Sequence, residues 1–302
     1  MKLLITGAWN CTLEQLNIIK SMGHEILFMQ NERDELPCGS EDVDGIICNG
    51  LFLHHNIQQF KNLKYIQLTS AGVDRVPVDY VKEHNITINN ARGVYSIPMA
   101  EYTVCGVLEL LKHSQIHFQN QTKHKWKKER TIGELYVKTV CVVGCGSVGN
   151  EVAKRFAALG CKIVGVDLFP RKDDKFETIY PLDKLSEAFS QSDIIVLTLP
   201  LTEQTKYLIN KKTLDTMKNS AILVNISRGQ IINTEDLVEA LRKRSISGAV
   251  LDVFEEEPLA ENSPLWDMGN VIITPHNSFV GDGNRKRLSD IIFRNLRDKS
   301  CI

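Results

Sequence analysis

Apolar residues fall into short continuous runs, and stretches with helical spacing separate these runs. In the first hundred residues the pattern predicts a helix over residues 12–22 and strands over residues 2–6, 25–29, 45–48, 65–69 and 86–88. Strands that alternate with helices are typical of a parallel sheet covered on both faces. The first part of the chain is therefore predicted to be an α/β unit.

A second α/β series follows a predicted long helix, which Ser96 would cap and whose first turn would contain Pro98. Its expected strands are near-continuous apolar runs, as strands buried on both faces should be: residues 139–143, 162–166, 193–199, 221–226, 248–253 and 271–274. Six parallel strands with intervening helices make a complete doubly wound dinucleotide fold. Residues 281–302 are predicted to form one amphipathic helix, with an apolar face of Leu288, Ile291, Ile292 and Leu296.

A glycine-rich turn lies between the first strand of this second series and its helix. Residues 144–149 read Gly-Cys-Gly-Ser-Val-Gly and fit the pattern G-x-G-x-x-G. In that motif Gly144 would form the tight turn, Gly146 would let the backbone approach a pyrophosphate, and Gly149 would allow close packing of helix on strand. The context predicts a dinucleotide site.

Asp167 closes the next strand and indicates which dinucleotide binds. A carboxylate at this place accepts hydrogen bonds from the ribose diol and repels a 2′-phosphate, so NAD is expected in preference to NADP. Arg171 and Lys172 follow shortly after and would soften that preference.

Three charged or titratable residues come at the ends of successive predicted strands. Arg228 follows the strand that ends in Asn225-Ile226, Glu257 follows the next strand, and His276 follows the last. Open α/β sheets bind ligands at this edge. Arginine clamps a carboxylate and polarises a carbonyl, and histidine beside glutamate favours the protonated imidazole that acts as an acid. Reduction of a 2-oxo acid by hydride needs both functions.

Composition narrows the classes of partner. The 302 residues carry 36 Lys and Arg against 37 Asp and Glu, a net charge of −1. This balance argues against nucleic acid or an anionic membrane as the main partner, and no apolar run is long enough to span a bilayer. The start of the chain lacks a signal-peptide pattern, so a cytoplasmic location is expected. The eight cysteines lack zinc-site or disulfide-framework spacing and are expected to be reduced and mostly buried.

Two smaller clusters have competing interpretations. Residues 119–130 form a polar segment with Lys123, Lys125, Lys127, Lys128 and Arg130 around Trp126. A solvated arm or subunit contact is favoured over a nucleic-acid contact because the chain as a whole is neutral. His113 and His117 have a spacing that would hold a metal on one helix, but no H-E-x-x-H accompanies them, so ordinary surface histidines are favoured and no metal is expected.

Taken together, the motifs resemble the D-isomer-specific 2-hydroxyacid dehydrogenases, the family that includes phosphoglycerate, glycerate and D-lactate dehydrogenases. The resemblance covers nearly the whole chain. Besides the glycine-rich turn and Asp167, it is carried by Ser-Ala-Gly-Val-Asp at 70–74, Asn-Ala-Arg-Gly at 90–93, Ala-Glu-Tyr at 100–102, Leu-Pro-Leu-Thr at 199–202, Ser-Arg-Gly at 227–229, Glu-Pro-Leu at 257–259 and Thr-Pro-His at 274–276.

The resemblance implies roles for the matching residues. His276 would donate the proton to the carbonyl oxygen, Glu257 would be its partner, and Arg228 would clamp the substrate. Backbone N–H groups of Ser70, Ala71 and Gly72 would bind the substrate carboxylate. The implied cofactor contacts are Gly144, Gly146, Ser147, Val148, Gly149, Asp167, Pro200, Ile226 and Asp252, the last orienting the nicotinamide carboxamide.

The resemblance also implies how the domains are arranged. A Rossmann cofactor domain over residues 98–280 would be inserted into a smaller flavodoxin-like substrate domain made of residues 1–97 and 281–302. The active site would lie in the cleft between them, and an arm near residues 119–137 would join two chains in a homodimer. The substrate would be a small 2-oxo or 2-hydroxy acid. The alternative is an NAD-sensing binding protein, similar to the co-repressors that share this fold.

Overall fold

The structure, a computed structural model, describes residues 1–298 and divides into two compact units. One unit comprises Met1–Tyr95 and the segment that begins at Gly281, and the other comprises Ser96–Val280. Ser96 and Ile97 belong to the second unit because they open its first helix. Cys301 and the end of the helix predicted over 281–302 lie outside the described residues.

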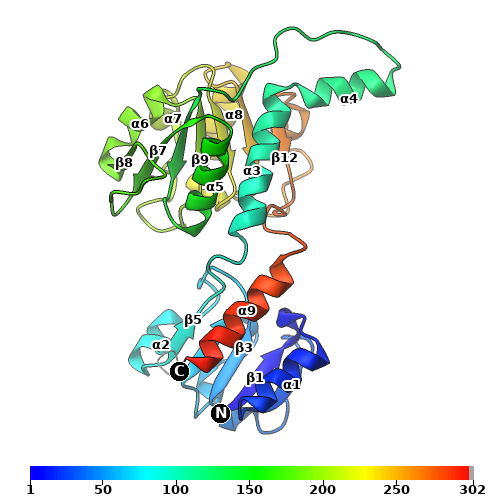
Figure 1. Ribbon diagram of the computed structural model, residues 1–302, viewed down its shortest axis with the longest axis vertical. Coiled ribbons are helices and arrows are strands. Elements are labelled where there is room, and N and C mark those ends of the chain that lie inside the picture. The colour runs from blue at the N-terminus through cyan, green and yellow to red at the C-terminus, as the bar shows by residue number, and fades with distance from the viewer. Residues whose placement is uncertain (299–302) are drawn as a thin grey trace. The chain divides into compact units, whose positions relative to one another are not determined.

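The first unit contains a five-stranded parallel sheet with strand order β2-β1-β3-β4-β5 (Figure 1). This is the flavodoxin-like order, and it confirms the predicted fold class. The strand predicted over 86–88 lies one residue later, and the strand predicted over 65–69 is one residue shorter. The strands are β1 (Lys2–Thr6), β2 (Glu25–Met29), β3 (Gly45–Cys48), β4 (Tyr65–Leu68) and β5 (Thr87–Asn89).

Helices cover both faces of this sheet, because successive side chains of a strand point to opposite sides. Leu3 and Ile5 of β1 pack in one cluster with residues of α1 (Leu13–Ser21) and α9 (Asn284–Arg297). Leu4 packs in the opposite cluster with α2 (Val78–Glu83). In α9 the buried apolar residues are Leu288, Ile292 and Leu296, so the predicted apolar face is the one that packs.

The second unit contains a seven-stranded parallel sheet with order β12-β11-β10-β9-β6-β7-β8. The prediction of six strands is wrong, because β8 (Thr178–Pro181) pairs with β7 at the edge. Its four residues are exposed or only partly buried, and therefore the segment lacks the apolar run that marks the other strands. Those are β6 (Thr139–Val143), β7 (Lys162–Asp167), β9 (Ile194–Leu197), β10 (Ile222–Asn225), β11 (Gly248–Leu251) and β12 (Val271–Ile273).

Two apolar cores lie on opposite faces of this second sheet. One contains Val140 and Val142 of β6 with residues of α3 (Ser96–Leu111) and α5 (Ser147–Ala158). The other contains Cys141 and Val143 with residues of α6 (Leu185–Gln191), α7 (Lys211–Leu214) and α8 (Thr234–Arg242). The strand order beginning at β8 is the Rossmann order with one further strand, and its reversal between β6 and β9 creates the edge where ligands bind.

The long helix predicted from Ser96 ends before it reaches His113 and His117. α3 stops at Leu111, and His113 has a left-handed backbone (φ 53°) before α4 (Ser114–Thr122) begins. His113 and His117 are therefore not on one helix, and among residues 1–298 no three His, Cys, Asp or Glu residues gather as a metal site. α4 has no buried residue, and Figure 1 shows it projecting away from the sheet, to which the following chain returns in a long loop.

Cysteines are free throughout the described residues. Cys48, Cys141, Cys145 and Cys161 are buried, whereas Cys38 and Cys105 are exposed. Burial raises the pKa of the Cys145 thiol to about 12, so this thiol keeps its proton at neutral pH.

None of the helices within residues 1–298 has the length and apolar character needed to cross a membrane.

Candidate active site

The glycine-rich turn connects β6 to α5 at the reversal point of the second sheet. Gly144 has a φ of +100°, and a Cβ there would lie 2.7 Å from the backbone nitrogen of Leu199. A Cβ at Gly149 would lie 2.2 Å from the Gly144 carbonyl oxygen, so both positions require glycine. A Cβ at Gly146, in contrast, would meet no atom within 4 Å. The turn is thus packed on its inner side and open at Gly146.

The open side of the turn fits a dinucleotide. Gly146 is the N-cap of α5 and offers no side-chain cap to the first N–H groups of that helix. Such N–H groups and the helix dipole attract an anionic pyrophosphate. Ser147 opens the helix, with its Oγ 2.9 Å from Ser96 Oγ, and Val148 packs partly against the core. This geometry matches what a bound dinucleotide requires of its phosphate loop.

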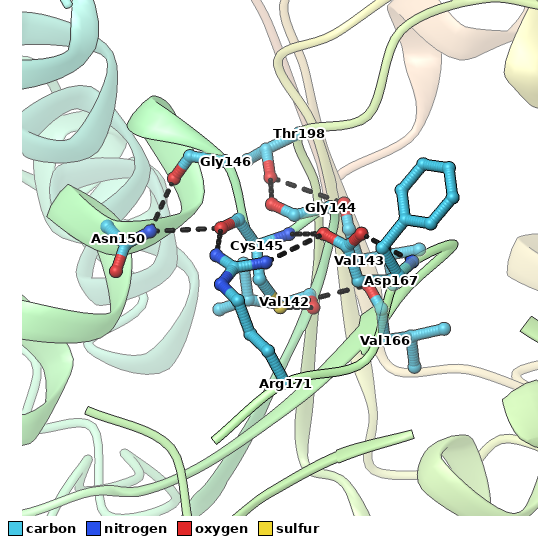
Figure 2. Close-up of polar contacts among 11 residues, drawn as sticks. Val142, Val143, Gly144, Cys145, Gly146, Asn150, Val166, Asp167, Arg171 and Thr198 are labelled. Carbon is cyan, nitrogen blue, oxygen red and sulfur yellow. Dashed lines mark hydrogen bonds and ion pairs between the residues drawn. The ribbon is translucent and has the colours of Figure 1, made fainter. Parts of the chain in front are cut away.

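Asp167 lies at the end of β7 beside the same turn (Figure 2). Its Oδ2 accepts a hydrogen bond of 2.7 Å from the backbone N–H of Cys145, and its Oδ1 accepts one of 3.0 Å from Phe169 N–H. The Arg171 guanidinium lies 3.9 Å from Oδ2 and donates to the Cys145 carbonyl. Arg171, which was expected to influence the choice of cofactor, therefore contacts both Asp167 and the glycine-rich turn.

Arg228 is presented by a tight turn after β10. Asn225 Oδ1 accepts from the Ser227 N–H and hydroxyl at 3.1 and 2.8 Å, while Asn225 Nδ2 donates to the Arg228 carbonyl at 3.0 Å. A Cβ on Gly229 would lie 1.8 Å from the carbonyl carbon of Phe254. The Arg228 turn is therefore in direct backbone contact with the loop that carries Glu257.

Glu257 and His276 are in contact, as the chemistry of the pair requires. Glu257 Oε2 lies 2.8 Å from His276 Nδ1, and Oε1 accepts from Phe254 N–H at 3.1 Å. The two side chains are 36% and 43% exposed, so the pair is reachable from solvent. His276 itself has a left-handed backbone (φ 50°), and its N–H donates to the Asp252 carbonyl at 2.8 Å.

Asp252 is fully buried, and its side chain contacts the loop that contains His276. Its Oδ1 accepts from the Thr274 hydroxyl at 2.5 Å and from Asn277 N–H at 2.7 Å, and its Oδ2 accepts from Ser278 N–H at 2.9 Å. An ionised carboxylate has about four acceptor positions, so these bonds leave room for one more donor. Asp252 thus holds the loop around His276 in addition to any contact with a cofactor.

The remaining predicted cofactor residues differ in their surroundings. Pro200 is exposed after β9, and its carbonyl accepts from Thr205 Oγ1 at 2.7 Å. Ile226 is 2% exposed and packs in the core. The Ile226 side chain therefore packs in the core just beyond the end of β10 and is closed to solvent.

The loop of Ser70, Ala71 and Gly72 follows β4 in the first unit. Ser70 Oγ donates to the Gly72 carbonyl at 2.9 Å, Asn90 Nδ2 donates to the Ala71 carbonyl at 2.7 Å, and Ala91 N–H donates to the Ser70 carbonyl at 2.8 Å. Among residues 1–298, no protein acceptor is recorded for the N–H groups of these three residues. Successive N–H groups without protein acceptors can bind an anion.

The sequence alone indicated no role for Asn225 and Tyr102, which form hydrogen bonds with the Arg228 turn and with Thr274. Asn225 precedes the Arg228 turn, and Tyr102 of α3 bonds to Thr274 beside the His276 loop. Asn225 has a local signal, because a buried polar residue at a strand end commonly bonds its own turn. Tyr102 has none, since its partner is 172 residues away.

Comparison with known proteins agrees with this geometry. Residues 104–278 match the family model described as D-isomer specific 2-hydroxyacid dehydrogenase, NAD binding domain. A glyoxylate reductase from Thermofilum pendens is 33% identical over 283 residues, covering 90% of this chain and 83% of the relative.

Two similar solved structures bind different dinucleotides. A D-lactate dehydrogenase from Aquifex aeolicus, complexed with NAD and lactic acid, aligns over 98% of this chain and 94% of its own, with a TM-score of 0.78 and 25% identity. A D-isomer specific 2-hydroxyacid dehydrogenase from Xanthobacter autotrophicus, in complex with NADPH and MES, aligns over 98% and 93%, with a TM-score of 0.80 and 25% identity. The chain therefore belongs to the D-isomer-specific 2-hydroxyacid dehydrogenase family and has its NAD(P)-dependent oxidoreductase activity.

Proposed function

We propose that this protein interconverts a small 2-oxo acid and its D-2-hydroxy acid, with His276, Glu257 and Arg228 as the catalytic residues. The observation that carries the proposal is the 2.8 Å contact between Glu257 and His276. This pair follows strands of the same sheet that presents the glycine-rich turn at its reversal point. An acid–base group and a dinucleotide loop on one sheet support redox chemistry at a carbonyl carbon.

In the proposed mechanism, His276 donates its proton to the carbonyl oxygen during reduction and removes it during oxidation. Glu257 accepts from Nδ1–H, which fixes the ring and leaves Nε2 as the atom that exchanges the proton. The Arg228 guanidinium binds the substrate carboxylate and polarises the carbonyl. The N–H groups of Ser70, Ala71 and Gly72 bind the same carboxylate. When bound, the nicotinamide supplies or accepts the hydride.

For the cofactor we propose NAD in preference to NADP. The phosphate loop would be Gly144, Gly146, Ser147, Val148 and Gly149, with Asp167 on the ribose hydroxyls. Pro200 and Ile226 would border the cofactor, and Asp252 would accept from the carboxamide. The Asp167 carboxylate supports NAD because it repels a 2′-phosphate. A higher kcat/KM with NADPH than with NADH would overturn this preference.

A panel of 2-oxo acids tests the proposed function and identifies the substrate. Pyruvate, hydroxypyruvate, glyoxylate, branched-chain oxo acids and phosphohydroxypyruvate would each be mixed with NADH or NADPH, and absorbance at the nicotinamide band followed. We expect turnover with at least one acid and a D-hydroxy product by chiral chromatography. Absence of turnover with the whole panel, together with NAD-dependent binding of a protein partner, would favour the NAD-sensing alternative.

We also propose a homodimer joined through the arm near residues 119–137. Trp126 is 99% exposed, and Phe118, Ile132 and Tyr136, which lie in the same stretch of sequence, are also exposed. Exposed apolar residues on a projecting segment are typical of an interaction surface. Light scattering would give the molar mass of Trp126→Ala and of the unmodified chain, and an unchanged dimer mass in the variant would show that Trp126 is not needed at the interface.

We also propose a cytoplasmic location, which the free cysteines support and which cell fractionation tests.

A further inference from the structure

A chain of hydroxyl groups leads from α3 to the buried carboxylate below His276. Tyr102 Oη lies 2.5 Å from Thr274 Oγ1, and Thr274 Oγ1 lies 2.5 Å from Asp252 Oδ1. The three residues come from α3, the end of β12 and the end of β11, all within Ser96–Val280. The contacts therefore connect a helix on one face of the sheet to the edge where the catalytic residues lie.

The chemistry of the three groups fixes the direction of these hydrogen bonds. The Thr274 hydroxyl donates its single proton to Asp252 Oδ1. Thr274 Oγ1 can then only accept from Tyr102, which must donate its phenolic proton. Burial raises the pKa of Tyr102 to about 12, so the phenol carries that proton at neutral pH.

The carboxylate at the end of this chain sets the path of the backbone on both sides of His276. Thr274 precedes the catalytic histidine by two residues, and Asn277 and Ser278 follow it directly. Asp252 contacts all three through its side chain and accepts the His276 N–H through its carbonyl. The left-handed backbone at His276 is an uncommon conformation for a residue with a side chain, and surrounding bonds must maintain it.

We propose that Tyr102 is a positioning residue for the catalytic acid, acting through Thr274 and Asp252 on the loop that presents His276. This proposal rests on the proposed function for its kinetic consequence. The phenol fixes the rotamer of Thr274, the threonine fixes the plane of the Asp252 carboxylate, and the carboxylate fixes the N–H groups of Asn277 and Ser278. Loss of the phenolic oxygen loosens the whole series without removing any group that contacts substrate.

Tyr102→Phe is the direct test, because the ring that packs against the apolar core remains. We expect kcat to fall about two- to tenfold, the range that corresponds to one hydrogen bond. The Kd of NADH, measured by fluorescence, should rise by less than kcat falls, because the proposed pyrophosphate and ribose contacts do not involve Asp252. Tyr180→Phe is the matched control: it removes another hydrogen-bonded phenol of the same unit, bonded to Gln191, and should leave kcat unaltered.

Thr274 variants show whether Tyr102 acts through the proposed route. Thr274→Val should lower kcat at least as much as Tyr102→Phe, and the double variant should be no slower than Thr274→Val alone. Thr274→Ser keeps the hydroxyl and should retain most of the activity. A wild-type kcat in Tyr102→Phe, or independent and additive losses in the double variant, would overturn the proposal.

Hydrogen exchange separates this proposal from the proposed function. In Tyr102→Phe the peptide covering residues 276–280 should exchange its amide hydrogens faster than in the unmodified protein, whereas Tyr180→Phe should not change that rate. This readout needs no turnover. Unmodified protein that turns over no 2-oxo acid would contradict the proposed function, while unchanged exchange in Tyr102→Phe would contradict the positioning role.

Discussion

Gly229 is the position where a single methyl group should disrupt the proposed catalytic arrangement most. A Cβ built there lies 1.8 Å from the carbonyl carbon of Phe254, 1.9 Å from its oxygen and 2.4 Å from the nitrogen of Glu255. All three are backbone atoms, so no side chain can rotate away. Gly229→Ala therefore forces the Arg228 turn and the Glu257 loop apart.

The size of the displacement follows from ordinary contact distances. Contacts to a Cβ begin near 3.4 Å, so the two backbones must separate by about 1.6 Å, the difference between 3.4 and 1.8 Å. A misplacement of about 1 Å in an active site can cost about a hundredfold in rate. We expect kcat/KM to fall about a hundredfold or more, equivalent to about 2.7 kcal/mol of transition-state stabilisation. Overpacking should also lower the free energy of unfolding by about 1–3 kcal/mol.

The assay compares Gly229→Ala with Gly269→Ala, using the best 2-oxo acid of the panel. A Cβ at Gly269 meets no atom within 4 Å, so this variant controls for the chemical change itself and should remain fully active. NADH binding should be retained in both, because neither glycine belongs to the phosphate loop. A Gly229→Ala protein with unreduced kcat/KM would refute the idea that contact between these two loops sets the catalytic geometry.

Three further predictions concern charged groups. Arg171→Ala should lower the ratio of kcat/KM for NADPH to that for NADH about two- to fivefold, because it removes the cation beside Asp167; an unchanged ratio would show that Arg171 does not act on the 2′-position. Arg228→Ala should raise KM and lower kcat together, since one side chain both clamps and polarises, and steady-state kinetics that show a change in KM alone would contradict this. The hydrogen bond from the Lys2 N–H holds the pKa of the Asp44 carboxyl below its ordinary value. The stability that this bond provides is therefore fully present above the pKa of Asp44 in the unfolded chain, and it is lost as the pH falls through the lower pKa of Asp44 in the folded protein. Denaturant unfolding of Asp44→Asn should therefore show a deficit at pH 7 that shrinks in acid, and a deficit independent of pH would contradict this reasoning.

Local patterns were sufficient to predict most of the fold. Apolar runs located the other strands because their residues are buried on both faces, although the strands predicted over 193–199 and 221–226 are shorter in the structure, Ile194–Leu197 and Ile222–Asn225. β8 was not predicted, because an edge strand with partly exposed residues lacks a continuous apolar run. The separate helix α4 was not predicted either, because its polar sequence has no apolar face and none of its residues is buried.

The candidate site could be predicted only where its residues have local signals. The glycines precede a helix, and Arg228, Glu257 and His276 follow strands, so sequence places them at one sheet edge. Contacts between distant segments carry no such signal. The hydrogen bond of Tyr102 to Thr274, and the approach of Gly229 to Phe254, follow from tertiary packing that no local pattern specifies.

The most direct test of the catalytic assignment is single-site replacement of the proposed acid. His276→Ala would be assayed for NADH-dependent reduction of the best 2-oxo acid, with NADH binding measured in parallel by fluorescence. Loss of general acid catalysis should lower kcat about 10²- to 10⁴-fold while the Kd of NADH stays unchanged. Undiminished turnover in His276→Ala would contradict the account.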